Sequence, residues 1–217
     1  MQNIRLQYTS WEEMPTEVQA LFVQWMDNRA EQGRAFYELY FYWFNIAHEL
    51  GHALRAYYGT SDTSHWGEET AVNEFAVAYW KGRGEAERLL HLRELVGDAF
   101  GRLEDPVPPD EGRSSYFDTH YSELSSKPSA YGHYQFSMVL TALGKQLDIA
   151  QVLHTLIMPQ AHEAAPPPAA PYSVINADLP ARIVNDMRDY LASYGVGLPE
   201  IQVVRSFSPM IQFIDWD

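Results

Sequence analysis

The sequence predicts a mainly α-helical protein with a single domain over residues 1–217 and at most a small β-hairpin near its C-terminus. Apolar side chains recur every three to four residues along most of the chain, which is the spacing of helices that bury one face. Apolar residues make up 46% of the chain and charged residues 20%, so there is material for one sizeable core and too little charge to keep the chain unfolded. Strand-like alternation is confined to residues 201–216.

The first half of the chain is predicted to form four helices. The first begins with Ser10 and Glu13, which match a capping box, and it ends before Gly33. The second has the longest apolar stripe and ends at Gly59, because glycine readily adopts the left-handed conformation that closes many helices. Gly82 ends the third helix. We expect these helices to cover residues 11–32, 35–58, 68–80 and 85–102.

The middle of the chain contains a segment with an irregular composition. Several prolines and a Ser/Tyr-rich stretch between residues 103 and 128 predict a long surface loop with little regular structure. Helical spacing returns over residues 129–156, with a break near Leu147. Long loops in compact domains are often functional, so residues of this loop are candidates for the site.

The C-terminal part begins with a proline-rich run. Residues 159–173 favour an extended, semi-rigid tether. A helix over residues 179–194 and a small hairpin around Ser208 and Pro209 are predicted to follow. Residues 178–217 are too few to form their own core, so we expect them to pack back on the main body.

The composition excludes several classes of function. The chain has 15 Lys and Arg against 29 Asp and Glu, and its formal net charge of −14 disfavours nucleic acid and anionic membranes as partners. No apolar stretch approaches the ~20 residues that span a bilayer. The chain has no cysteine, so any metal must be bound by His, Asp or Glu. The N-terminal residues lack the pattern of a secretory signal, and we expect a cytoplasmic location.

A metal-binding pattern lies in the second predicted helix, where residues 48–52 read His-Glu-Leu-Gly-His. Helical residues four apart differ by about 40° around the axis and about 6 Å along it, so His48 and His52 can reach one metal ion. Glu49 lies about 100° from His48, near enough to take a proton from a water that the metal activates. The plain alternative is a pair of histidines that are hydrogen-bonded in the core or exposed on the outer face.

A catalytic zinc needs a third protein ligand and one open position. The next predicted helix carries Glu68, Glu69 and Glu74, and the loop over residues 60–67 allows it to fold back on the second helix. For Glu68 we favour a charge at a helix N-terminus, and for Glu74 a place on a solvated face.

The run over residues 69–76, Glu-Thr-Ala-Val-Asn-Glu-Phe-Ala, resembles the ExxxN-x-F-A segment that follows HExxH in the ImmA/IrrE-type zinc peptidases, within the gluzincin group. The resemblance covers about residues 45–80 and implies a zincin-like helical metallopeptidase domain that binds Zn²⁺. It implies Glu69 as the third zinc ligand and Asn73, one turn further along, as a partner that orients a ligating imidazole. The family's Leu-Leu-x-Pro ending and a helix-turn-helix are absent, so we do not expect cleavage of a DNA-bound repressor.

With Zn²⁺ held by His48, His52 and Glu69, the expected function is hydrolysis of a peptide bond in a peptide or protein substrate. The metal polarises the carbonyl group, and Glu49 acts as the general base for the attacking water.

The developing oxyanion needs one further hydrogen-bond donor from another segment. We select Tyr131, with His133 second, because a helix that starts after Pro128 holds a side chain more firmly than a loop does. The remaining candidates are Tyr116, His120, Tyr121 and Tyr134.

Two other functions fit the sequence. One is a zinc-binding protein without peptidase activity, in which a fourth ligand such as His65 or Glu74 closes the site. The other is a protein-interaction module that uses the aromatic helix and residues 159–173. Core packing is the first interpretation of the aromatic cluster, and the lining of a substrate pocket is the alternative. The cluster consists of Phe36, Tyr37, Tyr40, Phe41, Tyr42, Trp43 and Phe44.

Overall fold

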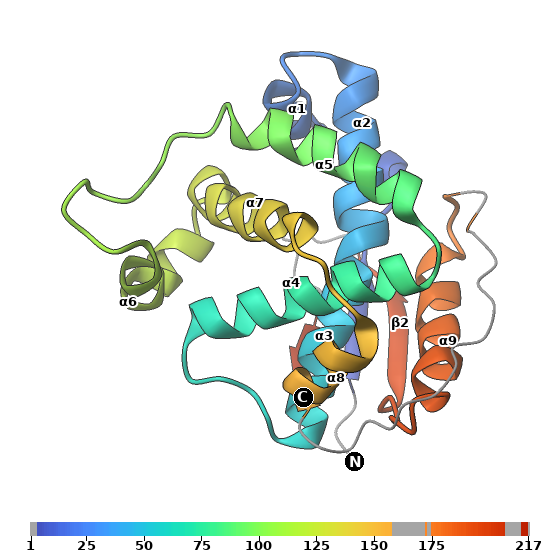
Figure 1. The fold of residues 1–217 in the computed structure, drawn as a ribbon. Coiled ribbons are helices and arrows are strands. Elements are labelled where there is room, and N and C mark those ends of the chain that lie inside the picture. The colour runs from blue at the N-terminus through green and yellow to red at the C-terminus, as the bar shows by residue number, and fades with distance from the viewer. Residues whose placement is uncertain (1–3, 158–171, 173–174, 207–213, 217) are drawn as a thin grey trace.

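The computed structural model describes residues 4–157, 172, 175–206 and 214–216. It confirms the mainly α-helical fold, since helices form most of the described chain and the only strands there belong to one small sheet (Figure 1). The expected tether lies outside the described residues, apart from Tyr172.

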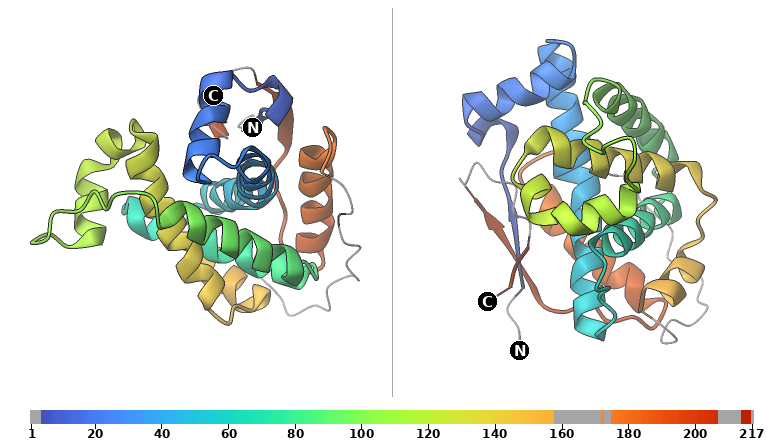
Figure 2. Two further views of the ribbon diagram at one scale, coloured as in Figure 1. Left: turned by 90° about the horizontal axis from the view of Figure 1, so that it is seen from above. Right: turned by 90° about the vertical axis from the view of Figure 1, so that its left-hand side faces the viewer.

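The elements are arranged in three layers (Figures 1 and 2). The central layer is a helical column formed by α2 (Ala30–Leu39) and α3 (Asn45–Tyr58). The small sheet lies on one side of this column. On the other side lie α4 (His65–Gly82), α5 (Ala86–Phe100) and α7 (Pro128–Gly144).

The predicted helix over residues 11–32 is divided in the structure. A 3₁₀ turn (Trp11–Glu13) and α1 (Thr16–Trp25) come first, and the chain then changes direction at residues 27–28. These two residues, Asp and Asn, have φ angles of 58° and 60°, in the left-handed region that a right-handed helix cannot use. Gly33, where a break was expected, lies inside α2.

Gly33 allows α2 to approach α1 closely. A Cβ atom at this position would lie 2.8 Å from the Cα of Val23, so the backbone of α1 would have to move. We expect Gly33→Ala to lower the free energy of unfolding by about 1–3 kcal/mol, measured by urea denaturation. Gly97→Ala is the control, because a Cβ there meets no atom within 4 Å and alanine favours a helix by up to about 1 kcal/mol. A Gly33 variant as stable as the wild type would contradict this packing.

The helix predicted over residues 35–58 ends as expected, because Gly59 adopts a φ of 69° and closes α3. It is not a regular α-helix throughout. Between α2 and α3 the chain forms a π-helical turn, Tyr40–Phe44. Such turns are rare, and they change the direction in which the preceding side chains point.

The remaining predicted helices are present. Ser64 caps α4, since its Oγ accepts a hydrogen bond of 3.0 Å from the Gly67 amide. The break near Leu147 separates α7 from α8 (Ile149–Ile157). The last helix, α9 (Leu179–Ala192), agrees with the predicted range.

The expected loop over residues 103–128 is partly wrong, because Arg113–Ser125 form a helix, α6, which projects from the body (Figure 2). Phe117 is fully buried in a small apolar cluster with α7. Asp118 accepts a hydrogen bond of 2.7 Å from the Trp66 amide at the start of α4. These contacts with distant segments stabilise a helix that the local composition did not predict.

The expected C-terminal hairpin is also wrong. In the described part of the chain, β1 (Ile4–Tyr8) lies between β2 (Ile201–Arg205) and β3 (Ile214–Trp216). It pairs parallel with β2 and antiparallel with β3. The two alternating segments therefore both pair with the N-terminal strand, which has only five residues and was not predicted. Buried side chains of α9 belong to the main core, so this helix packs on the body.

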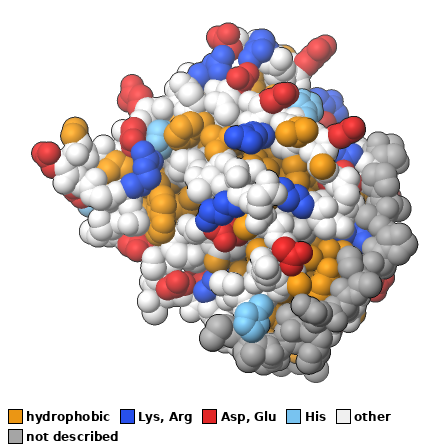
Figure 3. Space-filling model, viewed as in Figure 1, with side chains coloured by type: hydrophobic (Ala, Val, Ile, Leu, Met, Phe, Trp, Pro, Cys, Tyr) orange, Lys and Arg blue, Asp and Glu red, His pale blue; other side chains and the backbone are white. Residues whose placement is uncertain are grey.

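The visible surface is mixed in charge. On the face in Figure 3, acidic groups are scattered among lysines and arginines, and the basic groups do not form a continuous patch. This face lacks the basic stripe that typically binds a phosphate backbone. Among the helices of the described residues, none has the length and apolar character needed to cross a bilayer.

Candidate metal centre

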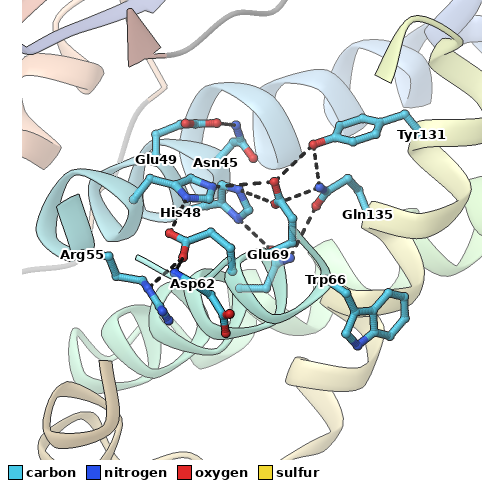
Figure 4. A network of polar contacts seen from close by, with 12 residues as sticks. Asn45, His48, Glu49, Arg55, Asp62, Trp66, Glu69, Tyr131 and Gln135 are labelled. Atoms are coloured by element: carbon cyan, nitrogen blue, oxygen red, sulfur yellow. Dashed lines mark hydrogen bonds and ion pairs between the residues drawn. The ribbon is translucent and has the colours of Figure 1, made fainter. Parts of the chain in front are cut away.

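Close packing of α3 against α4 brings three potential metal ligands together. A Cβ on Gly51 of α3 would lie 3.1 Å from side-chain atoms of α4, so the glycine permits this approach. One ligand atom each from His48, His52 and Glu69 lies within 4.8 Å of the others (Figure 4). These are the three residues expected as ligands.

The His48 side chain is held with one nitrogen toward Glu69. Its Nε2 lies 3.3 Å from Glu69 Oε2, and its Nδ1 lies 2.9 Å from Asn73 Oδ1. The amide oxygen can only accept, so Nδ1 carries a proton, and Nε2 is the nitrogen that faces Glu69 and would bind a metal. Asn73, the residue that the resemblance implies as a partner of a ligating imidazole, is thus hydrogen-bonded to His48.

His52 is oriented by the carboxylate of Glu68, for which the sequence predicts only a charge at a helix N-terminus. His52 Nδ1 lies 3.2 Å from Glu68 Oε1, and His52 Nε2 lies 3.8 Å from Glu69 Oε1. Glu68 is itself fixed by Arg55, whose Nε lies 3.0 Å from Oε2. No local pattern marks this role, because the His52 and Glu68 side chains meet only when α4 folds back on α3.

Two side chains of α7 also form hydrogen bonds with Glu69. Gln135 Nε2 donates to Glu69 Oε2 at 2.8 Å, and the Tyr131 hydroxyl donates to Glu69 Oε1 at 3.3 Å. Gln135 Nε2 also donates to the Tyr131 oxygen at 2.9 Å. Tyr131 therefore lies at the site, as predicted. Gln135 was missed, although it lies one helical turn from Tyr131 and hence on the same face.

The charged side chains of the site change one another's pKa values. Burial by itself raises the pKa of Glu69, but the hydrogen bond from His48 and the charges of His52 and His48 hold it at about 2. Burial lowers the pKa of His52, whereas its hydrogen bond to Glu68 and the charges of Glu69 and Glu49 raise it to about 9. The carboxylates thus create a negative potential at the histidine nitrogens, which also favours a divalent cation.

Glu49 lies beside the three ligands and is not one of them. Asn45, one turn earlier in α3, donates a hydrogen bond of 3.0 Å to Glu49 Oε1. Burial raises the pKa of Glu49, and the nearby charges of His48 and His52 oppose this rise. A carboxylate with a raised pKa is suited to proton transfer near neutral pH.

Of the other candidates, Tyr121 lies beside Tyr131, with ring centroids 6.1 Å apart, and burial and the charge of Glu69 raise its pKa. The remaining candidates lie away from the three ligands. His65 is exposed and stacks on Tyr121 with ring centroids 3.8 Å apart, and Glu74 pairs with Lys145. His133 packs on Phe100 of α5, with ring centroids 4.6 Å apart. Tyr116 and His120 stack on each other in α6, and Tyr134 packs in the cluster between α6 and α7.

The donor set fits zinc. Two imidazole nitrogens and one carboxylate are a common set for a catalytic site, and each imidazole has its second nitrogen hydrogen-bonded. Within the described residues, neither His65 nor Glu74 joins the group, so a tetrahedral ion held by these three residues would keep one position open.

Comparison with family models, curated proteins and solved structures found no match for this chain. The resemblance to the ImmA/IrrE-type peptidases therefore depends on the motif residues alone.

The hydrogen bond from His48 to Asn73 predicts a measurable effect on metal affinity. We expect Asn73→Ala to weaken zinc binding by about 10- to 100-fold, because the imidazole loses the group that fixes its tautomer and orientation. Asn73→Asp keeps an acceptor oxygen and should retain most of the affinity. Competition with a chromophoric chelator measures both variants. Wild-type affinity in Asn73→Ala would show that Asn73 does not orient the ligand.

Proposed function

We propose that this protein is a zinc-dependent peptidase that hydrolyses peptide bonds in a peptide or protein substrate. The observation that carries the proposal is the convergence of His48, His52 and Glu69 next to a fourth ionisable group, Glu49, that does not belong to the ligand set. A structural zinc site needs four ligands and no such neighbour.

The residues divide into three roles. His48, His52 and Glu69 would hold the zinc, which when bound polarises a carbonyl group and lowers the pKa of water. Glu49, fixed by Asn45, accepts the proton of the attacking water and passes it to the leaving amine. Tyr131 would donate a hydrogen bond to the substrate oxygen, since its hydroxyl lies 3.3 Å from a ligand oxygen.

The proposal is tested with zinc-loaded protein and a library of fluorescence-quenched peptides. Cleavage that stops on addition of a chelator and returns with zinc would support it. Absence of cleavage by protein with one zinc per chain would contradict it and favour a zinc-binding protein without peptidase activity.

The variant Tyr131→Phe tests whether the Tyr131 hydroxyl donates a hydrogen bond to the substrate oxygen. The variant loses only the hydroxyl group, so the ring keeps its contact with Phe117 of α6. We expect kcat to fall by about 10- to 100-fold, because one donor to the oxyanion is lost. His133→Ala, on the face toward α5, should leave kcat unchanged. The assignment of Tyr131 is wrong if the two variants have the same kcat.

A further inference from the structure

Tyr40 is the first residue of the π-helical turn that precedes α3. In a regular α-helix, a residue eight positions before His48 would lie about 80° away from it around the axis. A π-helical turn holds one extra residue, which reduces this offset to about 20°. The turn therefore brings Tyr40 toward the side of the column that carries His48, where a regular helix would not.

Packing holds the Tyr40 ring in this direction. The ring stacks on Phe36 with centroids 5.6 Å apart, and its edge contacts Phe136 at 5.1 Å. Phe136 follows Gln135, which binds Glu69, so the ring lies between the column and the part of α7 that contacts the site. The aromatic cluster is thus mostly core, and Tyr40 packs against the part of α7 that contacts the site.

The carboxylates of the site are near enough for their charges to act on the hydroxyl group of Tyr40. Burial raises the pKa of Tyr40, and the charges of Glu69 and Glu49 raise it further, so the phenol stays protonated and can donate. The residue is 3% exposed. Its hydroxyl has no hydrogen-bond partner among the described residues, and it keeps some contact with space that water can reach.

We propose that the Tyr40 hydroxyl is a further catalytic group of this centre, which donates a hydrogen bond to the water molecule that Glu49 deprotonates. The π-helical turn gives the side chain its direction, and the contacts with Phe36 and Phe136 hold it there. This inference rests on the proposed zinc centre. A donor at this place orients the water with its proton toward Glu49.

The test uses the full chain loaded with cobalt(II), which occupies sites of this kind and absorbs visible light. Sodium azide serves as a small anion that takes the place of the water. Azide affinity is measured by the change in absorption for the wild type, Tyr40→Phe and Tyr42→Phe. Tyr42 is a matched control, because it lies in the same π-helical turn and its hydroxyl donates to the Asn176 carbonyl at 3.2 Å, away from the site.

We expect azide to bind about tenfold more weakly to Tyr40→Phe, because a hydrogen bond to an anion is lost. Azide affinity in Tyr42→Phe should stay within about twofold of the wild type. With a peptide substrate, kcat of Tyr40→Phe should fall about tenfold at constant KM, with an unchanged melting temperature. Equal azide affinity in Tyr40→Phe and the wild type would overturn the inference alone. Failure of the wild type to bind cobalt would overturn the proposed metal centre and the inference with it.

Discussion

Glu49→Gln is expected to lower kcat by about a thousandfold and to leave one zinc per chain. The amide has nearly the same shape as the carboxylate and keeps an oxygen that can accept the hydrogen bond from Asn45. It cannot accept a proton near neutral pH, so the attacking water loses its base. Metal analysis by mass spectrometry and peptide cleavage, measured on the same sample, check both parts of the result.

Glu38→Gln is the matched control for this experiment. Glu38 lies on α2 and forms an ion pair with Arg34, remote from the ligand set. Its loss should change neither zinc content nor kcat. Full activity in Glu49→Gln would show that another group accepts the proton, and loss of zinc in this variant would place Glu49 among the ligands.

Glu69→Ala is expected to reduce the zinc content from about one per chain to less than about 0.1, because two histidines alone do not hold zinc firmly. The same loss is expected for His48→Ala and for His52→Ala. Protein purified without chelators and analysed by mass spectrometry gives the comparison.

Glu74→Ala controls for the removal of a carboxylate from α4. Glu74 lies on the same helix and pairs with Lys145, so its loss should leave zinc content unchanged. A Glu69→Ala variant that keeps its zinc would contradict the ligand set. Absence of zinc in the wild type, after metal has been offered, would contradict the proposed centre as a whole.

Local sequence determined most of the helices and the first part of the site. Gly59 ends α3 because only a residue tolerant of positive φ fits there, and the break near Leu147 was visible in the spacing of apolar residues. His48 and His52 could be paired from the sequence because helical geometry fixes residues four apart. Glu69 and Asn73 were found from a resemblance over a short motif, and the structure places both against the histidines.

Tertiary structure decided the contacts between segments that are distant in the chain. Glu68 and Gln135 contact the ligands only because α4 folds back on α3 and α7 packs on α4. The same holds for the sheet, since β1 lies about two hundred residues from the strands beside it. The π-helical turn, Tyr40–Phe44, was likewise not predicted from the local sequence. Local sequence specifies periodicity, caps and motif spacing, whereas the partner of each buried polar group is chosen by contacts that exist only in the folded chain.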